Sequence, residues 1–147
     1  MVNKQFGLGV FICFFNKNFS KILLLKRNKE KREKWGADWG NIGGKIEFGE
    51  TSIQACLREI KEEIGINLNQ ELLKLLFVKE TPDFLKTIHG LHFVYATIFN
   101  EESIIQINSE SDSYGWFELD NLPNNMIDSR EEILHIAKLA REHFKNE

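Results

Sequence analysis

Residues 44–66, GKIEFGETSIQACLREIKEEIGI, decide how this chain is organised. The second half of the stretch predicts a helix over 52–64. Thr51 followed by Gln54 forms a capping box, in which each residue satisfies a backbone amide of the other. Gly65 supplies the left-handed residue with which many helices end. A short glycine-containing loop leads into this helix.

The predicted helix has one apolar face and one acidic edge. The apolar residues recur at helical spacing and form one stripe: Ile53, Leu57, Ile60 and Ile64. Glu59, Glu62 and Glu63 share an arc of about 100° on one flank, where like charges repel. Two interpretations are open. The edge is a solvated helix face, as in other glutamate-rich surface helices, or it binds a cation, and all-oxygen ligands suit Mg²⁺ or Mn²⁺.

Three glycines lie in the loop that enters the helix: Gly43, Gly44 and Gly49. Glycine allows close backbone approach, so such a loop can direct amides or carbonyls at a phosphate or a metal ion. Loop and helix together resemble the signature box of the Nudix hydrolases at every fixed position. The matching residues are Gly44, Glu50, Arg58, Glu59, Glu62, Glu63 and Gly65, with aliphatic residues at Ile60 and Ile66.

This resemblance implies an enzyme, a cofactor and a set of site residues. Nudix hydrolases cleave nucleoside diphosphates linked to a variable group X, with Mg²⁺ or Mn²⁺ held by the box helix. Carried over by position, the implied metal ligands are Glu59, Glu62, Glu63 and the carbonyl of Gly43. Glu59 is the expected general base or orienting ligand, and Glu110 of a later loop is an additional catalytic and metal-binding carboxylate. Arg58 and Glu50 are expected to form an ion pair that fixes loop to helix.

Composition predicts one globular domain over 1–147. The chain has 147 residues, of which 42% are hydrophobic, enough for one substantial core. Its formal net charge is -3 and its 19 lysines and arginines are scattered, which argues against a duplex nucleic-acid binder. No apolar run reaches the roughly 18 residues that span a bilayer, so we expect a soluble, cytoplasmic protein without membrane contact. Cys13 and Cys56 lack zinc or disulfide spacing and are expected to be buried.

The remaining chain predicts an α/β fold. Apolar, β-branched runs and turn residues place strands at 6–15, 21–27, 72–80, 88–99 and 114–119, and an amphipathic helix at 129–145. The first two strands should form a hairpin, and Pro82 should stop the third strand. The highly charged stretch 28–34 is expected to be a mobile loop. This order predicts an α/β/α sandwich with a mixed sheet between helices, the fold that the Nudix resemblance also implies.

Four residues are candidates for substrate contact: Arg27, Trp35, Lys45 and Asp128. Arg27 ends a predicted strand, where its side chain either meets a phosphate or extends into solvent. Trp35 is either a packing residue or a platform for a nucleobase. The segment ESDSYGWFELDNLP, residues 110–123, resembles the Nudix enzymes that sanitise oxidised purine nucleotides. This resemblance puts Glu110 at their supporting acidic position and Asp128 near their base-reading acids.

The substrate is less well defined than the reaction. The proline-free loop WGNIGGKIEFGE resembles the corresponding loop of the same sanitising enzymes. Two positions depart from those enzymes: Ile127 stands where an aromatic residue is expected, and Gly40 replaces the polar residue that follows the tryptophan. Pro82 lies close to a proline associated with members that cleave ADP-ribose. We expect hydrolysis of a (deoxy)nucleoside triphosphate to monophosphate and pyrophosphate. ADP-ribose or a nucleotide sugar is the alternative substrate, and a non-catalytic nucleotide-binding module is a third possibility. The protein is expected to be a monomer or a homodimer.

Overall fold

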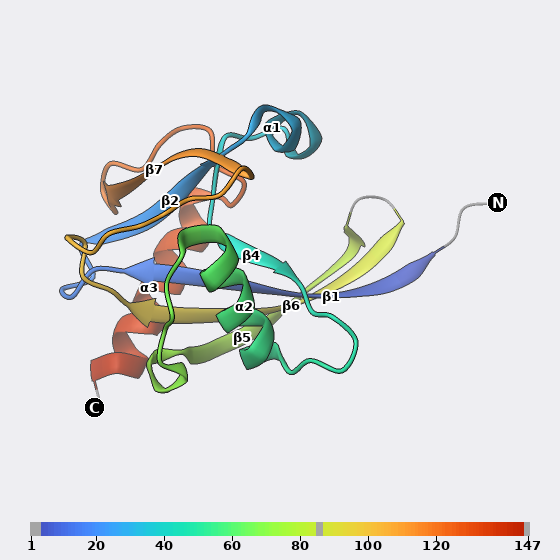
Figure 1. Ribbon diagram of the computed structural model, residues 1–147, viewed down its shortest axis with the longest axis horizontal. Helices are drawn as coiled ribbons and strands as arrows, with labels where there is room; N and C mark the ends of the chain where they lie inside the picture. Colours follow the sequence, from blue (N-terminus) through green and yellow to red (C-terminus); the bar gives the residue numbers. More distant parts are fainter. Residues whose placement is uncertain (1–3, 85–86, 146–147) are drawn as a thin grey trace.

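The computed structural model describes residues 4–84 and 87–145, and within these ranges seven strands form one mixed sheet (Figure 1). In chain order the elements are β1 (Gln5–Phe15), β2 (Lys21–Arg27), α1 (Lys29–Trp35), β3 (Trp39–Gly40), β4 (Ile42–Lys45), α2 (Ser52–Ile64), the 3₁₀ turn η1 (Gln70–Leu72), β5 (Lys74–Phe84), β6 (Ile88–Ile98), β7 (Ser111–Glu118) and α3 (Arg130–Lys145). The strand order is β3-β2-β1-β6-β5, with β4 paired to β1 and β7 paired to β2.

Strand β1 is the centre of this sheet. It runs parallel to β6 along its whole length, from Gln5 opposite Ile88 to Phe15 opposite Ile98. On its other side it pairs antiparallel with β4 and then, at Phe14 and Phe15, with β2. The hairpin of β1 and β2 is therefore confirmed. The sheet is mixed because the β1 and β6 pairing is parallel whereas the other pairings are antiparallel.

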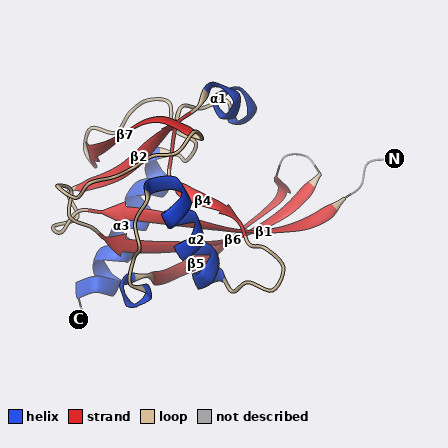
Figure 2. Cartoon of the chain, in the orientation of Figure 1, coloured by secondary structure: helices blue, strands red, loops and turns tan. Residues whose placement is uncertain are grey.

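Two helices cover opposite faces of the sheet (Figure 2). Successive side chains of a strand alternate between faces, so Ile12 of β1 packs in the core under α2 while Cys13 packs in the core under α3. Helix α2 contributes Ile60 and Ile64 to the first core, and α3 contributes Ile133 to the second. The predicted α/β/α sandwich is confirmed, and α2 carries the box on the face of the sheet away from α3.

Local signals at both ends fix the limits of α2. The Thr51 hydroxyl accepts a hydrogen bond from the Gln54 backbone at 3.1 Å, and the Gln54 side chain accepts one from the Thr51 amide at 2.9 Å. Gly65 has φ 72° and donates its amide to Lys61. The helix predicted over 52–64 thus begins and ends where the capping box and the glycine indicate.

The stretch 28–34 was expected to be a loop, and this prediction is wrong. Its residues form most of helix α1, which the Asn28 side chain caps by accepting from the Lys31 amide. Gly36, with φ 72°, ends the helix. None of the residues of α1 is buried. The helix has no apolar stripe, and its contacts include an ion pair from Arg32 to Asp112 at 2.5 Å and a ring contact of Trp35 with Phe84.

Pro82 does not stop the third long strand, so that expectation is also wrong. Strand β5 continues through Pro82 to Phe84, and its register against β6 shifts between Thr81 and Phe84. Strand β5 lies at the edge of the described sheet, where a residue without an amide N–H is tolerated, above all at a bulge. The short strands β3 and β4 were not predicted.

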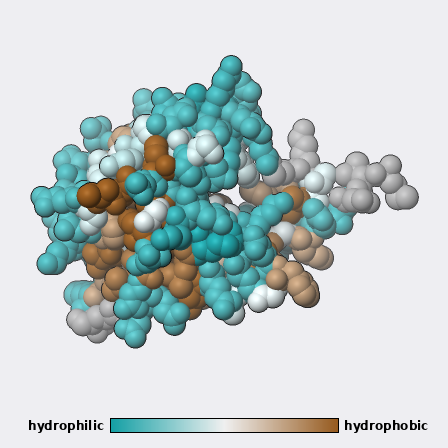
Figure 3. All heavy atoms as spheres, viewed as in Figure 1, coloured by the Kyte–Doolittle hydropathy of each residue, from teal (hydrophilic) through white to brown (hydrophobic). Residues whose placement is uncertain are grey.

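Both cysteines are buried, as predicted, and burial raises the pKa of Cys56 to about 12. None of the helices in the described part of the chain has the length and apolar character that crossing a membrane requires. One face of the molecule is largely hydrophilic, with hydrophobic residues gathered beside α2 on the side away from the N-terminus (Figure 3).

Candidate active site

The acidic edge of α2 is not a uniformly solvated face. Glu59 and Glu63 are buried, with 9% and 1% of their surface exposed, whereas Glu62 is exposed. Glu63 accepts a hydrogen bond from the Gly43 amide at 3.1 Å. A Cβ atom added to Gly44 would lie only 2.2 Å from Oε1 of Glu59. The two glycines of β4 therefore let the backbone approach both carboxylates. The sequence suggested instead that these glycines approach a phosphate or a metal ion.

Arg58 ties the loop before α2 to the helix. Its guanidinium donates to both oxygens of Glu50, at 2.8 and 2.9 Å, and to Oε1 of Glu59 at 2.8 Å. It also donates to the Lys45 carbonyl at 2.8 Å and lies 3.5 Å from Glu62. The expected ion pair of Arg58 and Glu50 is present. These hydrogen bonds lower the pKa of Glu50 to about 2.

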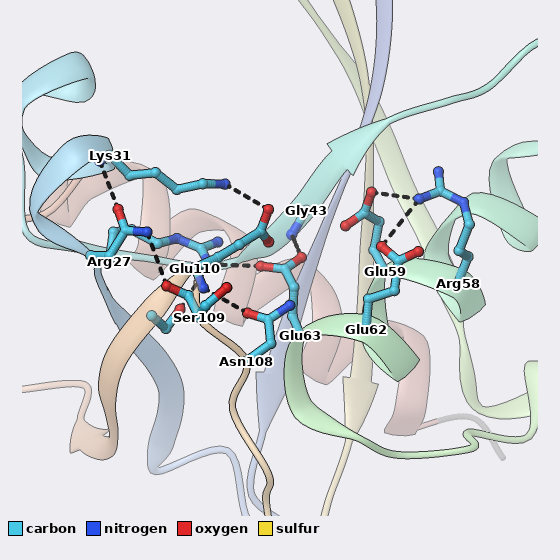
Figure 4. Close-up of polar contacts among 12 residues, drawn as sticks. Arg27, Lys31, Gly43, Arg58, Glu59, Glu62, Glu63, Asn108, Ser109 and Glu110 are labelled. Atoms are coloured by element: carbon cyan, nitrogen blue, oxygen red, sulfur yellow. Dashed lines mark hydrogen bonds and ion pairs between the residues drawn. The ribbon is translucent and has the colours of Figure 1, made fainter.

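Glu63 has a buried cationic partner that the sequence did not reveal. Nη1 of Arg27 lies 2.7 Å from Oε1 of Glu63, and Arg27 is only 7% exposed. Arg27 also donates to the Ser111 hydroxyl at 3.2 Å and to the Asn41 carbonyl at 2.5 Å. Its side chain thus does not extend into solvent. Figure 4 shows Glu63 turned toward Arg27 and Gly43, while Glu59 and Glu62 turn toward Arg58.

Burial dominates the electrostatics of the two inner carboxyl groups. It raises the pKa of Glu63 to about 7, although Arg27 opposes the rise. It also raises the pKa of Glu59, against the opposing effects of Arg58 and a hydrogen bond with Glu63. Two neighbouring carboxyl groups that are costly to ionise form a site where additional positive charge would be strongly stabilising.

Glu110 lies in the loop before β7 and is joined to α1. Its carboxylate is 3.4 Å from Nζ of Lys31, and its side chain is 42% exposed. The Asn28 backbone donates to the Glu110 carbonyl at 2.9 Å, and the Asn28 side chain donates to the Ser109 carbonyl at 3.0 Å. Since the next residue, Ser111, contacts Arg27, this loop reaches the surroundings of Glu63 (Figure 4).

The donors present fit a hard divalent cation. Among residues 4–84 and 87–145, no three Asp, Glu, His or Cys side chains come together closely enough to hold a metal on their own. Mg²⁺ and Mn²⁺ do not need such a cage, because one or two carboxylates suffice when waters and substrate phosphates supply the other ligands. Glu59 and Glu63, with glycine backbone beside them, meet that requirement.

Asp128 is joined to the box through Asn41. The side-chain amide of Asn41 donates to the Asp128 carboxylate at 3.1 Å, while the backbone carbonyl of Asn41 accepts from Arg27. Burial raises the pKa of Asp128. Oδ1 of Asn41 is buried and has no hydrogen-bond partner in the described part of the protein. Sequence reasoning missed Asn41, although its position two residues before Gly43 could have suggested it.

Trp35 and Lys45 are the other two candidates for substrate contact. Trp35 stacks at a tilt on Phe84, with ring centroids 5.4 Å apart, and Nζ of Lys34 lies 5.4 Å from the Trp35 ring. The Lys45 side chain is exposed, and its carbonyl is a partner of Arg58. Trp35 therefore has a packing contact, and the part of Lys45 engaged in the box is its backbone.

The chain resembles known proteins in sequence and in structure. The MutT NUDIX hydrolase from Burkholderia pseudomallei has a similar structure, with a TM-score of 0.67 and 28% identity over 95% of this chain and 98% of that chain. Dihydroneopterin triphosphate diphosphatase of Escherichia coli (strain K12) is 29% identical over 85 residues, which cover 58% of this chain and 53% of that protein. The m7GpppN-mRNA hydrolase of Saccharomyces cerevisiae (strain ATCC 204508 / S288c) is 28% identical over 133 residues, 88% of this chain and 12% of that protein.

The chain spans from 12% to 53% of the length of these two curated relatives. The family model described as NUDIX domain matches residues 5–136. This match extends from β1 into α3 and includes the box loop, α2 and the loop that carries Glu110. The chain therefore belongs to the Nudix hydrolase family.

Proposed function

We propose that the chain is a divalent-metal-dependent pyrophosphohydrolase that converts a (deoxy)nucleoside triphosphate to its monophosphate and pyrophosphate. The observation that carries this proposal is the pair of buried, neighbouring carboxyl groups of Glu59 and Glu63 on one edge of α2. Burying ionised carboxylates is costly unless a cation compensates them. Hydrolysis of a phosphoanhydride needs positive charge at the same place, because charge accumulates on the oxygens around phosphorus.

The proposed metal ligands are those implied by the family resemblance: Glu59, Glu62, Glu63, Glu110 and the Gly43 carbonyl. Bound Mg²⁺ or Mn²⁺ would supply Lewis acidity toward the phosphate oxygens and acidify a nearby water. Glu59 is proposed to accept the proton of the attacking water or to orient that water. A raised pKa suits a base that works near neutral pH. Arg58 and Glu50 hold the loop in register with the helix, which keeps the Glu59 carboxylate in place.

The proposed substrate carries a base that meets Asp128 and Asn41. Oδ1 of Asn41 has no hydrogen-bond partner among the described residues and can accept a hydrogen bond from a base edge, and the Asp128 carboxyl group beside it offers a second polar contact. One curated relative is an m7GpppN-mRNA hydrolase and the other a dihydroneopterin triphosphate diphosphatase. Ile127 packs over Gly40, where an added Cβ would lie 2.8 Å from its side chain. Ile127 and Gly40, the two positions that differ from the sanitising enzymes, thus form one apolar contact beside Asn41. We also propose a role in cleansing the nucleotide pool.

The test is a substrate panel incubated with Mg²⁺, in which products are identified by chromatography. The panel contains dGTP, 8-oxo-dGTP, dihydroneopterin triphosphate, m7GpppG and ADP-ribose. Monophosphate with pyrophosphate supports the proposal, whereas AMP with ribose 5-phosphate selects ADP-ribose as the substrate. A stoichiometric complex without product after long incubation would mean a binding module. A module that only binds its nucleotide has no chemical need for all three box glutamates, Glu59, Glu62 and Glu63.

Glu63→Gln is the matching variant. It keeps the size of the side chain and removes the charge, so we expect turnover with Mg²⁺ to fall to background while the circular dichroism spectrum is unchanged. Glu102→Gln, an exposed glutamate in the turn after β6, is the control and should keep wild-type activity. Full activity in Glu63→Gln would refute the mechanism.

A further inference from the structure

We propose that Arg27 is a positioning residue that neutralises Glu63 in the metal-free protein and competes with divalent metal for that carboxylate. The competition rests on the proposed function, because it requires Glu63 to be a metal ligand. The neutralisation of Glu63 stands on the structure alone. The two parts therefore have separate tests.

Both oxygens of Glu63 are engaged by groups of this chain. Arg27 holds Oε1 at 2.7 Å, and the Gly43 amide holds Oε2 at 3.1 Å. The side chains of Arg27 and Glu63 are 8% and 1% exposed, so water screens their attraction only weakly. Breaking such a buried pair leaves an uncompensated charge, which is far more costly than losing a surface ion pair.

The two arginines at the box differ in how their charges are balanced. Arg58 lies within 4 Å of four carboxylates: Glu47, Glu50, Glu59 and Glu62. Arg27 has one carboxylate partner in the described part of the chain, Glu63, and its other hydrogen-bond acceptors are the neutral Ser111 hydroxyl and Asn41 carbonyl. Among the described residues, Arg27 therefore has no second carboxylate to which it can turn when another cation approaches Glu63.

Two effects of opposite sign follow from this geometry. Without metal, Arg27 stabilises the fold because it compensates a buried negative charge. With metal, the fixed guanidinium repels the incoming cation at short range and weakens its binding. Arg27 keeps its positive charge when the metal is bound, so a phosphate chain is attracted by both the guanidinium and the metal. The site is thus arranged to bind metal together with phosphates more strongly than metal alone.

Thermal unfolding in EDTA at about pH 9, where carboxyl groups are ionised, tests the neutralisation of Glu63. Arg27→Gln should lower the unfolding midpoint by about 10 °C, because it leaves Glu63 buried without a counter-charge. Adding Glu63→Gln to this variant should restore most of the loss. Ser111→Ala is the matched control, since it removes a neutral partner of Arg27 and leaves the ion pair intact. An equal loss in Arg27→Gln with and without Glu63→Gln would overturn the proposal and make Arg27 a support for the backbone at Asn41.

Calorimetric titration with Mn²⁺ tests the competition. Arg27→Gln should bind Mn²⁺ about tenfold more tightly than the wild type, because the repulsion is gone. Arg27→Lys keeps the charge and should bind Mn²⁺ as weakly as the wild type. Mn²⁺ should also raise the unfolding midpoint of Arg27→Gln more than that of the wild type. Weaker binding in Arg27→Gln would overturn the competition, since a merely structural residue gives that result.

The remaining outcomes are also decisive. If Arg27→Gln does not fold in EDTA, recovery of its native spectrum on adding Mn²⁺ supports the proposal, and failure of the double variant to fold overturns it. If Glu63→Gln rescues Arg27→Gln but Mn²⁺ stabilises neither the wild type nor any variant, the proposed metal site fails and the competition fails with it. In that case the neutralisation of Glu63 by Arg27 is retained.

Discussion

Replacing Glu50 by glutamine removes the charge that ties the box loop to α2 and leaves the size of the side chain unchanged. Hydrogen bonds from Arg58 and from the Glu47 amide lower the pKa of Glu50 from 4.5 to about 2. A lowering of this size corresponds to about 3 kcal/mol of preference for the ionised form. The Glu50 and Arg58 side chains are 15% and 23% exposed. Solvent screening at this exposure reduces the expected loss of unfolding free energy to about 1–2 kcal/mol.

The dependence of this loss on pH has a definite sign. The pKa of Glu50 is lower in the folded protein, so the stabilisation is fully present above the unfolded value of 4.5 and is lost as the pH falls through about 2. Glutamine mimics the protonated form. The stability difference between the wild type and Glu50→Gln should therefore be largest near neutral pH and should fall to less than half of that value at about pH 3.

The assay is urea unfolding in EDTA followed by tryptophan fluorescence at both pH values. Glu47→Gln is the control, because the Glu47 side chain is 68% exposed and lies 3.8 Å from Arg58. We expect this control to cost about 0.5 kcal/mol or less. The reasoning fails if Glu50→Gln costs no more than Glu47→Gln near neutral pH. It also fails if the cost of Glu50→Gln is the same at both pH values.

Three further predictions concern the carboxylates themselves. Gly44→Ala should push the Glu59 carboxylate aside, since the new Cβ would lie 2.2 Å from Oε1; turnover should fall by about 100-fold, whereas unchanged kinetics would contradict the assigned role of Glu59. Because burial raises the pKa of Glu63 to about 7, metal must displace a proton, and Mg²⁺ affinity measured by calorimetry should rise between about pH 5 and pH 8. In metal-free protein the sign is opposite: the contribution of Glu63 to stability is present below its unfolded pKa of 4.5 and is lost as the pH rises through about 7. Thermal unfolding in EDTA should show this trend for the wild type and not for Glu63→Gln.

The elements that could be predicted from the sequence are those specified by neighbouring residues. Helix α2 is one of them, because Thr51, Gln54 and Gly65 are capping signals that act within a few residues. Helix α1 has the same kinds of signal in Asn28 and Gly36. It was missed because the prediction depended on an apolar stripe, and KEKREKW has none. A search for caps alone would have found it.

Tertiary contacts explain what the sequence could not reveal. Arg27 and Glu63 are 36 positions apart, and the packing of α2 on the sheet brings them together. The separation of the two residues in the sequence does not predict this contact. The continuation of β5 through Pro82 depends on its place at the edge of the described sheet, which is a property of strand order. The spacing of the box glutamates, by contrast, is local, so their convergence on one edge of α2 could be predicted.

The parallel pairing of β1 with β6 has a consequence for the way the chain emerges from the ribosome. The residue opposite Gln5 is Ile88, and at about 5–20 residues per second the intervening chain takes about 4–17 s to synthesise. During that time β1 can pair only in part, with β2 and β4. One long edge of a strongly apolar strand is left open to other nascent chains. The risk of aggregation during synthesis is therefore set by the position of β6 in the gene, and a chaperone would protect the chain most in this interval.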